Sequence, residues 1–584
     1  MRILPKISPV SLVPFRALLP VACLLLAALP LAATGFDAIR APHAMVASVH
    51  PEASRAGAEI MRAGGNSVDA AVAVGFALAV VHPAAGNIGG GGFLLYRLPN
   101  GEVHFLDFRE KAPAAASRNM YLDKDGNATQ ESRYGYRAAG VPGSVAGLVE
   151  AERRWGKLGL AKVMEPAIRM AREGVVITQH EAEVMHEKHL GEDAESRRIF
   201  QRDGHYYEKG EVLKQPELAA TLERIASNPA DFYHGQLAHQ VAAAIQKHGG
   251  LVTFADLDSY TVVERTVLHG TYRGYDVYSA PPPSSGGVAL LETLNILEGY
   301  DLKSARSNSA QHIHLVAEAY RRAFFDRSVF LGDPDYVPVP VAQLIDKKYA
   351  EAWREHLDPA KATPSGQLER PAFADLDRMA ALREPATDGE KTDTTHYSVV
   401  DPDGGAVSVT TTLNDIFGSR ATLPGFGFLL NDEMDDFATK PGSANMFGLI
   451  QGEANAIAPG KRPLSSMTPA IVVKDGKLAL VLGSPGGPTI ITTVANVLIH
   501  AVDYGEEIQH AVNAPRFHHQ WMPDELRVEN WQLSPDTLDL LEKMGHKLKR
   551  TGSWGDAECI AIDSKTGDRL GASDARNGGQ AVGW

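Results

Sequence analysis

Two runs of β-branched and apolar residues flank a short polar turn near residue 403, and this pattern predicts a β-hairpin. The first run covers 394–401 and the second covers 406–412, with Asp403-Gly404 in the turn between them. An Asp-Gly turn between such runs is a strong hairpin signal. In an antiparallel pair centred on residue 403, Thr394 and Thr412 are expected to face each other, so the hairpin ends in paired hydroxyl groups.

The N-terminal half is predicted to be largely helical. The Ala-rich segments 52–63 and 67–81 read as helices, and the second is apolar on nearly every face, which indicates burial. Further helices are predicted within 144–360, at 144–155, 161–173, 236–248 and 309–330, with strand-like Thr266-Val267 and 275–278 between them.

Two more hairpins are predicted. Strands 93–98 and 103–109 flank Asn100-Gly101 after a glycine run at 86–92, and this spacing places Arg109 opposite Gly92. A cation beside backbone without side chains suits the close approach of a ligand. Strands 470–474 and 477–483 flank Asp475-Gly476 and lead into a helix at 489–504.

The segment before the first hairpin indicates a processing site. Residues 361–393 are polar and contain three prolines, so we expect a flexible connector that runs directly into a buried strand. This abrupt change favours cleavage between Asp393 and Thr394. A new terminal α-amine has a pKa of about 7.7–8 and can accept the proton of the hydroxyl on the same residue, so Thr394 would supply both nucleophile and base.

Composition and charge limit the partners and the compartment. The chain has 584 residues and a formal charge of −14, which argues against nucleic acid as a partner. Basic residues precede an apolar run at 17–33, so we expect residues 1–33 to be a signal peptide that directs export to the periplasm. An uncleaved anchor and secretion from the cell are the alternatives. Cys559 would be the only cysteine after cleavage, which excludes an intramolecular disulfide.

Polar groups near the second hairpin complete a candidate site. Gly486 and Gly487 precede a helix, where backbone N–H groups can form an oxyanion hole. An acidic loop at 431–437 suits an ammonium group, and the Gly/Asn-rich segment 441–457 suits a mobile cover. The pair His518-His519 has no further ligand at metal-binding spacing, so we expect it to be structural.

Several long motifs in this order resemble one family, the gamma-glutamyltranspeptidases or glutathione hydrolases of the N-terminal-nucleophile hydrolase superfamily. The resemblance covers essentially the whole mature chain. Its strongest marks are Thr394–Asp401, Arg462–Met467, Gly483–Gly487 and Asn513–Trp521, and weaker support comes from Leu106–Arg109 and Pro281–Gly287.

The resemblance implies an α+β fold, a four-layer αββα sandwich formed jointly by two autoprocessed subunits. The precursor would cut itself between Asp393 and Thr394 into a large subunit, 34–393, and a small catalytic subunit, 394–584. Thr394 would attack the γ-glutamyl amide of glutathione and related donors. Water, or an amino acid or dipeptide acceptor, would then take the glutamyl group.

The resemblance also implies roles for individual residues, without a cofactor or metal. Thr412 would hydrogen-bond the nucleophile Thr394, and Phe447 would belong to the lid, where relatives often carry Tyr. Glu433 replaces a Gln that is common in bacterial relatives. The expected hydrogen-bond donors to the oxyanion are Gly486 and Gly487. The α-carboxylate of the γ-glutamyl donor would bind to Arg109, Ser465 and Ser466. Its α-amine would bind to Asn414, Glu433 and Asp436.

The sequence leaves other functions open. A glutaryl-cephalosporin acylase or a poly-γ-glutamate hydrolase of the same fold is the nearest alternative. A glutaryl donor has no α-amine and would not need Asp436, and the cover at 441–457 would hinder a long polymer. An inactive exported binding protein is a further alternative, which an intact Thr394 hairpin disfavours.

Overall fold

The structure is a computed structural model that describes residues 37–373, 376–380, 394–440 and 451–584. The expected signal peptide, Asp393 and Phe447 lie outside the described residues. Residues Ala38–Trp584 form one compact unit. Within the described residues, no helix combines the length and apolar character that a membrane crossing requires.

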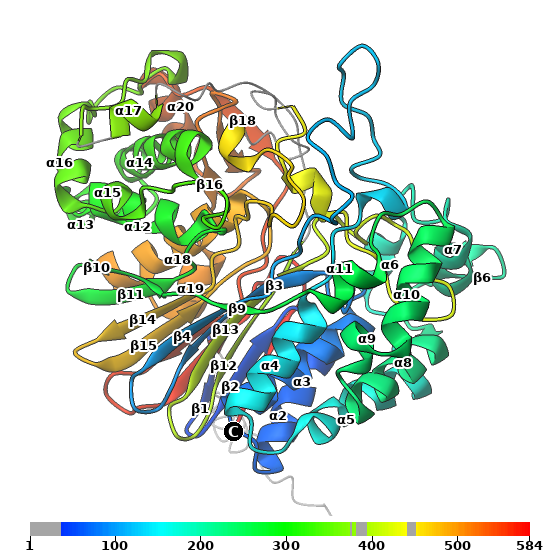
Figure 1. Ribbon diagram of the computed structural model, residues 1–584. Coiled ribbons are helices and arrows are strands. Elements are labelled where there is room, and N and C mark those ends of the chain that lie inside the picture. The colour runs from blue at the N-terminus through cyan, green and yellow to red at the C-terminus, as the bar shows by residue number, and fades with distance from the viewer. Residues whose placement is uncertain (1–36, 374–375, 381–393, 441–450) are drawn as a thin grey trace, which may run out of the picture. The chain divides into compact units, whose positions relative to one another are not determined.

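Two antiparallel β-sheets of seven strands each lie at the centre of this unit (Figure 1). The first sheet has the order β21 (Gln580–Gly583), β2 (Met45–Ser48), β12 (Thr395–Val400), β13 (Ala406–Thr412), β3 (Gly91–Arg97), β4 (Val103–Asp107) and β9 (Val263–Glu264). The second has the order β1 (Ile39–Ala41), β20 (Arg569–Ala572), β19 (Cys559–Ile562), β15 (Lys477–Leu482), β14 (Ala470–Lys474), β11 (Tyr275–Ser279) and β10 (Leu268–Tyr272).

Alternating side chains on the first sheet separate two hydrophobic cores. On β3, Phe93 and Leu95 belong to a core shared with Val277 and Leu482 of the second sheet. Leu94 and the ring of Tyr96 point to the opposite side, into a core shared with the helices that cover the first sheet. This period of two is what a strand buried on both faces requires.

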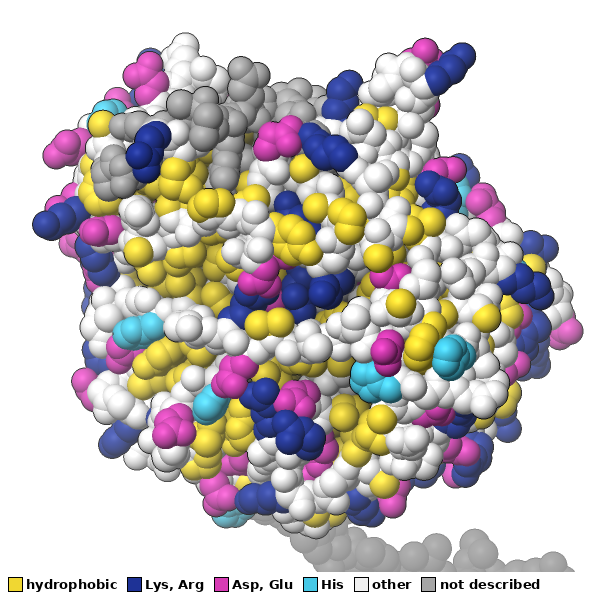
Figure 2. Space-filling view, in the orientation of Figure 1, with side chains coloured by type: hydrophobic (Ala, Val, Ile, Leu, Met, Phe, Trp, Pro, Cys, Tyr) yellow, Lys and Arg dark blue, Asp and Glu magenta, His cyan; other side chains and the backbone are white. Residues whose placement is uncertain are grey.

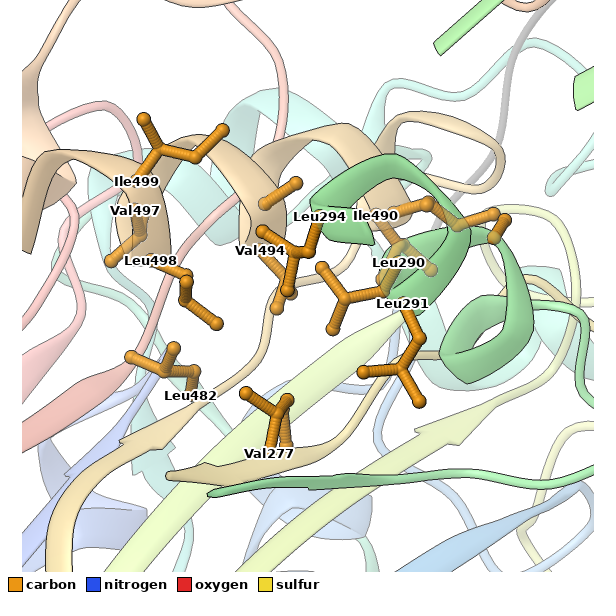
Figure 3. Packing of buried hydrophobic residues seen from close by; sticks show 14 of the residues in the cluster. Val277, Leu290, Leu291, Leu294, Leu482, Ile490, Val494, Val497, Leu498 and Ile499 are labelled. Atoms are coloured by element: carbon orange, nitrogen blue, oxygen red, sulfur yellow. The ribbon is translucent and has the colours of Figure 1, made fainter. Parts of the chain in front are cut away.

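Helices α2 (Pro51–Arg62) and α3 (Ser67–Val81) cover the outer face of the first sheet, as their apolar sequences predict. Asn66 and Asp69 form a capping box at the start of α3, and every residue of α3 is buried. On the second sheet, α12 (Gly286–Leu297) and α18 (Thr489–Asp503) pack side chains such as Leu291 and Val494 over the strands (Figure 3).

The helices expected at 144–155, 161–173, 236–248 and 309–330 are confirmed as α4 (Ser144–Trp155), α5 (Leu160–Glu173), α10 (Gln236–Lys247) and α14 (Ala310–Phe330). The remaining helices are α6 (Gln179–Met185), α7 (Ala194–Phe200), α8 (Pro216–Ser227), α9 (Asp231–His234), α11 (Phe254–Asp258), α13 (Leu302–Ala305), α15 (Val341–Leu344), α16 (Lys347–Glu355), α17 (Leu376–Ala380), α19 (Ile508–Asn513) and α20 (Pro535–Lys543). Two short strand pairs are β5 (Val175–Val176) with β8 (Val212–Leu213) and β6 (Gln201–Arg202) with β7 (His205–Tyr206), and a three-stranded sheet is formed by β16 (Phe517–His518), β17 (Leu526–Glu529) and β18 (Leu548–Thr551).

The predicted register of the first hairpin is confirmed. Thr395 pairs with Thr411 and Val400 with Ala406, so the pairing is centred on residue 403. Thr394 immediately precedes β12 and Thr412 ends β13. The expected strand at Thr266-Val267 is wrong, because these residues lie between β9 and β10.

The register predicted for Arg109 is wrong by one residue. Gly92 exchanges backbone hydrogen bonds with Phe108, at 3.0 and 3.3 Å, and therefore does not face Arg109. The cause is the turn: the Leu98 N–H donates to the Glu102 carbonyl, so three residues, rather than Asn100 and Gly101 alone, form the loop. One extra loop residue shifts the pairing along the whole hairpin.

The described part of the expected connector is attached to the protein. The Ala362 N–H donates to the Met544 carbonyl at 2.7 Å, and the Arg370 Nε donates to Asp326 at 2.5 Å. These contacts tie residues up to about 373 to the helical side of the second sheet, whereas 381–393 lie outside the described residues.

Candidate active site

Thr394 and Thr412 form the centre of the site. The Thr394 side chain is nearly buried, and its Oγ1 lies 3.3 Å from the Thr412 Oγ1. The Asn414 N–H donates to the Thr412 Oγ1 at 2.8 Å, and its amide Nδ2 donates to the Asp432 carbonyl. Asn414 adopts a left-handed backbone conformation (φ 84°), which turns the chain away from β13. The Thr412 hydroxyl is thereby held beside the Thr394 hydroxyl.

His396 is the titratable side chain nearest to Thr394 along β12, but it is engaged elsewhere. Its Nδ1 lies 2.9 Å from the Thr410 Oγ1, and its Nε2 lies 3.2 Å from the Ser398 Oγ. Burial lowers the pKa of His396 to about 3, so the ring is neutral. These contacts make His396 part of the sheet interface rather than a base for Thr394.

Arg109 lies in a buried acidic cluster. Its guanidinium forms ion pairs with Glu433 and Asp436, which lie in a 3₁₀ turn at Glu433–Asp436, and it contacts the neighbouring Glu110 at 3.4 Å. The Arg109 Nε also donates to the Pro463 carbonyl at 3.3 Å. The structure therefore brings Arg109, which is expected to bind a carboxylate, next to Glu433 and Asp436, which are expected to bind an ammonium group.

This cluster holds more carboxyl groups than guanidinium groups. Burial raises the pKa of Glu110 to about 7 and raises the pKa values of Glu433 and Asp436, although Arg109 opposes the shift at each carboxyl. Burial acts against the charge of Arg109, but Glu433 and Asp436 outweigh it and raise its pKa. The raised carboxyl pKa values favour protonation in the ligand-free protein, and an added ammonium group would favour the ionised carboxylates.

A turn of prolines and serines supports the expected carboxylate side. The Ser465 N–H donates to the Pro283 carbonyl at 2.9 Å, and the Ser465 carbonyl accepts from the Ser285 N–H at 2.7 Å. The close packing needs Gly286, since a Cβ there would lie 2.2 Å from the Thr468 hydroxyl.

Arg327, near the end of α14, is a second buried guanidinium that sequence reasoning missed. Its Nε donates to the Ser285 Oγ at 2.8 Å and its Nη2 to the Ser466 Oγ at 3.2 Å. Burial lowers its pKa to about 10, while the charge of Asp436 opposes that shift. A signal for Arg327 is hard to find in the sequence, because the residue lies in a helix whose pattern indicates only burial.

The glycine turn after β15 lies next to β12. Gly483 packs against the His396 ring, where a Cβ would lie 2.0 Å away. Gly486 and Gly487 have φ of 127° and 55°, which favour glycine, and the Ile490 N–H donates to the Gly487 carbonyl as α18 begins. Among the described residues, neither the Gly486 nor the Gly487 N–H donates to another protein group.

The pair His518 and His519 is held by protein groups. His518 lies between the Thr492 hydroxyl and the Gln520 amide, at 2.9 and 2.8 Å. The His519 Nδ1 accepts from the Trp521 N–H.

Comparisons with known proteins identify the family of this chain. The family model described as gamma-glutamyltranspeptidase matches residues 53–584. The chain is 48% identical to the glutathione hydrolase proenzyme of Escherichia coli over 549 residues, which cover 93% of this chain and 92% of that protein. It resembles the crystal structure of a cephalosporin acylase from Bacillus halodurans with a TM-score of 0.82 and 28% identity, over 94% of this chain and 97% of that one.

A solved chain of the gamma-glutamyltranspeptidase of Helicobacter pylori covers 55% of this chain and 93% of itself, with 46% identity and a TM-score of 0.54. The family model spans most of the chain, and the similarity to the Escherichia coli protein extends over almost all of both proteins. On these grounds, the chain belongs to the gamma-glutamyltranspeptidase family.

Proposed function

We propose that this protein is an autoprocessed gamma-glutamyltransferase and glutathione hydrolase that acts on glutathione and related γ-glutamyl compounds. The observation that carries this proposal is the buried cluster of Arg109, Glu433 and Asp436, which offers one cation and an excess of carboxyl groups. An α-amino acid head group carries the complementary charges, a carboxylate and an ammonium.

Donor binding would exchange the partners of Arg109. In the ligand-free protein Arg109 is neutralised by Glu433 and Asp436. The donor's α-carboxylate would bind to the Arg109 guanidinium and to the Ser465 and Ser466 hydroxyls. Its α-ammonium would bind to the released Glu433 and Asp436 carboxylates and to Asn414. This exchange keeps every buried charge paired, as a low-dielectric site requires.

Thr394 would then carry out acyl transfer. Its α-amine accepts the hydroxyl proton as Oγ1 bonds to the γ-carbonyl carbon, and the Gly486 and Gly487 N–H groups hold the oxyanion. The carbon–nitrogen bond breaks, and the proton passes to the leaving amine. Water, or the amine of an amino acid or dipeptide acceptor, attacks the ester and releases Thr394. Thr412 would donate a hydrogen bond to Oγ1 throughout.

The proposal includes self-cleavage between Asp393 and Thr394 into subunits 34–393 and 394–584. Together these would form the four-layer αββα sandwich of N-terminal-nucleophile hydrolases. The partial coverage by one chain of the Helicobacter pylori enzyme supports two separate polypeptides. Phe447 would contribute to a lid, and removal of residues 1–33 would accompany export to the periplasm.

An acylase that removes a glutaryl group is the second candidate, since one structural relative is a cephalosporin acylase. Asp436 argues against it, because a glutaryl donor offers no ammonium to replace Arg109 as the partner of this carboxylate. For poly-γ-glutamate hydrolysis, the same cluster would have to accept the end of a polymer.

An intact-mass spectrum after incubation with γ-glutamyl-p-nitroanilide tests the proposed function. We expect two fragments, the smaller one starting at Thr394 and carrying a transient glutamyl adduct. A parallel incubation with glutaryl-p-nitroanilide, which lacks the α-ammonium, should give much less adduct. A single unmodified chain, or a preference for the glutaryl compound, would contradict the proposal.

Arg327→Lys should raise the KM for the donor by roughly 2- to 10-fold while kcat changes less than about twofold. Lysine keeps the charge but cannot span both Ser285 and Ser466, and a net hydrogen bond contributes about 0.5–1.5 kcal/mol. Steady-state kinetics with γ-glutamyl-p-nitroanilide measures this split. Arg118→Lys is the matched control, because Arg118 pairs with Glu453 at the surface. An equal change in both variants would show that Arg327 does not position Ser466.

A further inference from the structure

A cluster of three histidines and one glutamate lies apart from the residues assigned to the reaction, where α2, α3 and α6 approach each other. His50 caps the start of α2, and His82 follows the end of α3. His180 and Glu181 lie in the first turn of α6. The reaction proposed for Thr394 uses none of these side chains.

The spacing of the side chains fits a metal ion. The His82 Nδ1 lies 3.4 Å from the Glu181 Oε1, and one ligand atom each of His82, His180 and Glu181 lies within 4.8 Å of the other two. Zinc bonds of about 2.0–2.2 Å in a tetrahedron place neighbouring ligand atoms roughly 3.3–3.6 Å apart. His82 and Glu181 already have this separation, and a ring nitrogen of His180 lies within 4.8 Å of both ligand atoms.

A buried carboxylate oxygen in the cluster has no hydrogen-bond partner in the part of the chain that the structure describes. Glu181 is 2% exposed, and its Oε2 makes no hydrogen bond among the described residues. A buried polar atom without a partner is costly, so a cation held at this carboxylate would stabilise it.

His50 supports the cluster as a neighbour rather than a ligand. Its Nδ1 accepts from the Glu52 N–H at 3.2 Å, which places the ring hydrogen on Nε2. That nitrogen lies 3.8 Å from the Glu181 Oε2, beyond hydrogen-bond distance, so His50 borders the carboxylate without occupying it. A cavity of about 650 Å³ lies beside the cluster, lined by His50 and by the two residues before His180.

We propose that His82, His180 and Glu181 bind one divalent transition metal ion of the Zn²⁺ or Co²⁺ type. Two imidazoles and a carboxylate suit such ions, whereas Ca²⁺ and Mg²⁺ prefer sites made of oxygen ligands. Three protein ligands leave a position for water. This site departs from the expectation of no metal partner drawn from the sequence.

Metal titration of the processed, untagged protein after treatment with a chelator tests the site. We expect one Zn²⁺ per chain by calorimetry and a d–d absorption band typical of tetrahedral Co²⁺. His180→Ala and Glu181→Gln should each lower the affinity by at least roughly tenfold. His189→Ala is the matched control, because His189 forms a similar pair with Glu192 at the surface, 3.0 Å apart, and it should bind as the unchanged protein does.

Thermal unfolding gives an independent readout. Zn²⁺ should raise the melting temperature of the unchanged protein and of His189→Ala more than that of the two ligand variants. His180 is only half-buried, so its loss should leave the fold intact. If the unchanged protein binds no Zn²⁺ or Co²⁺, or if the ligand variants bind as tightly as the control, the proposal is overturned.

Discussion

Thr394→Ala will leave the precursor as one uncleaved chain that neither hydrolyses nor transfers a γ-glutamyl group. The change removes the hydroxyl that lies 3.3 Å from the Thr412 Oγ1. Since the same atom is proposed to start both self-cleavage and acyl transfer, both should fail together. Loss of a nucleophile in an enzyme of this kind costs roughly 10⁴-fold or more in rate. Gel electrophoresis and p-nitroaniline release measure the two effects.

Two variants make this prediction specific. Thr394→Ser keeps a hydroxyl and should retain cleavage and part of the activity. Thr395→Val is the matched control: Thr395 is buried, and its Oγ1 has no hydrogen-bond partner among the described residues. It should cleave and react normally. Two-band processing of Thr394→Ala, or failure of Thr395→Val alone, would move the nucleophile to another residue.

The hairpin that carries Thr394 was predictable because its turn and its pattern agree. The Asp-Gly turn determined the centre of pairing, and the alternating strands determined which faces are buried. The same reasoning failed at Arg109, where the Leu98 to Glu102 hydrogen bond closes a three-residue loop. A residue pattern alone does not distinguish loops that differ by one residue, and this difference decides which groups face each other.

The motifs predicted that Arg109, Glu433 and Asp436 belong to one site, but they did not predict that these residues pair with each other. From the sequence, Arg109 was expected to bind the α-carboxylate of the donor, and Glu433 and Asp436 were expected to bind its α-amine. In the folded, ligand-free chain they neutralise each other, since an isolated charge is costly away from water. Arg327 was missed for a related reason: its role depends on contacts with Ser285 and Ser466, which come from distant segments.

This pairing leads to the second large prediction. Asp436→Asn should lower kcat/KM for γ-glutamyl-p-nitroanilide by roughly 100-fold, mainly through KM, while self-cleavage stays intact. Asparagine keeps the shape but loses the charge that would hold the ammonium, and a hydrogen bond between charged groups contributes about 1.5–3 kcal/mol. Cleavage should persist because it requires Thr394 and the preceding carbonyl rather than a bound donor.

Asp435→Asn provides the matched control for Asp436→Asn. Asp435 lies in the same 3₁₀ turn but accepts a hydrogen bond from Ser132 at 2.5 Å instead of pairing with Arg109. Its substitution should change KM much less. Glutaryl-p-nitroanilide separates charge recognition from general damage: without an ammonium, its turnover should not fall in Asp436→Asn and should rise relative to the γ-glutamyl donor. An equal loss for both compounds would mean that Asp436 maintains the shape of the site and does not recognise the α-amine.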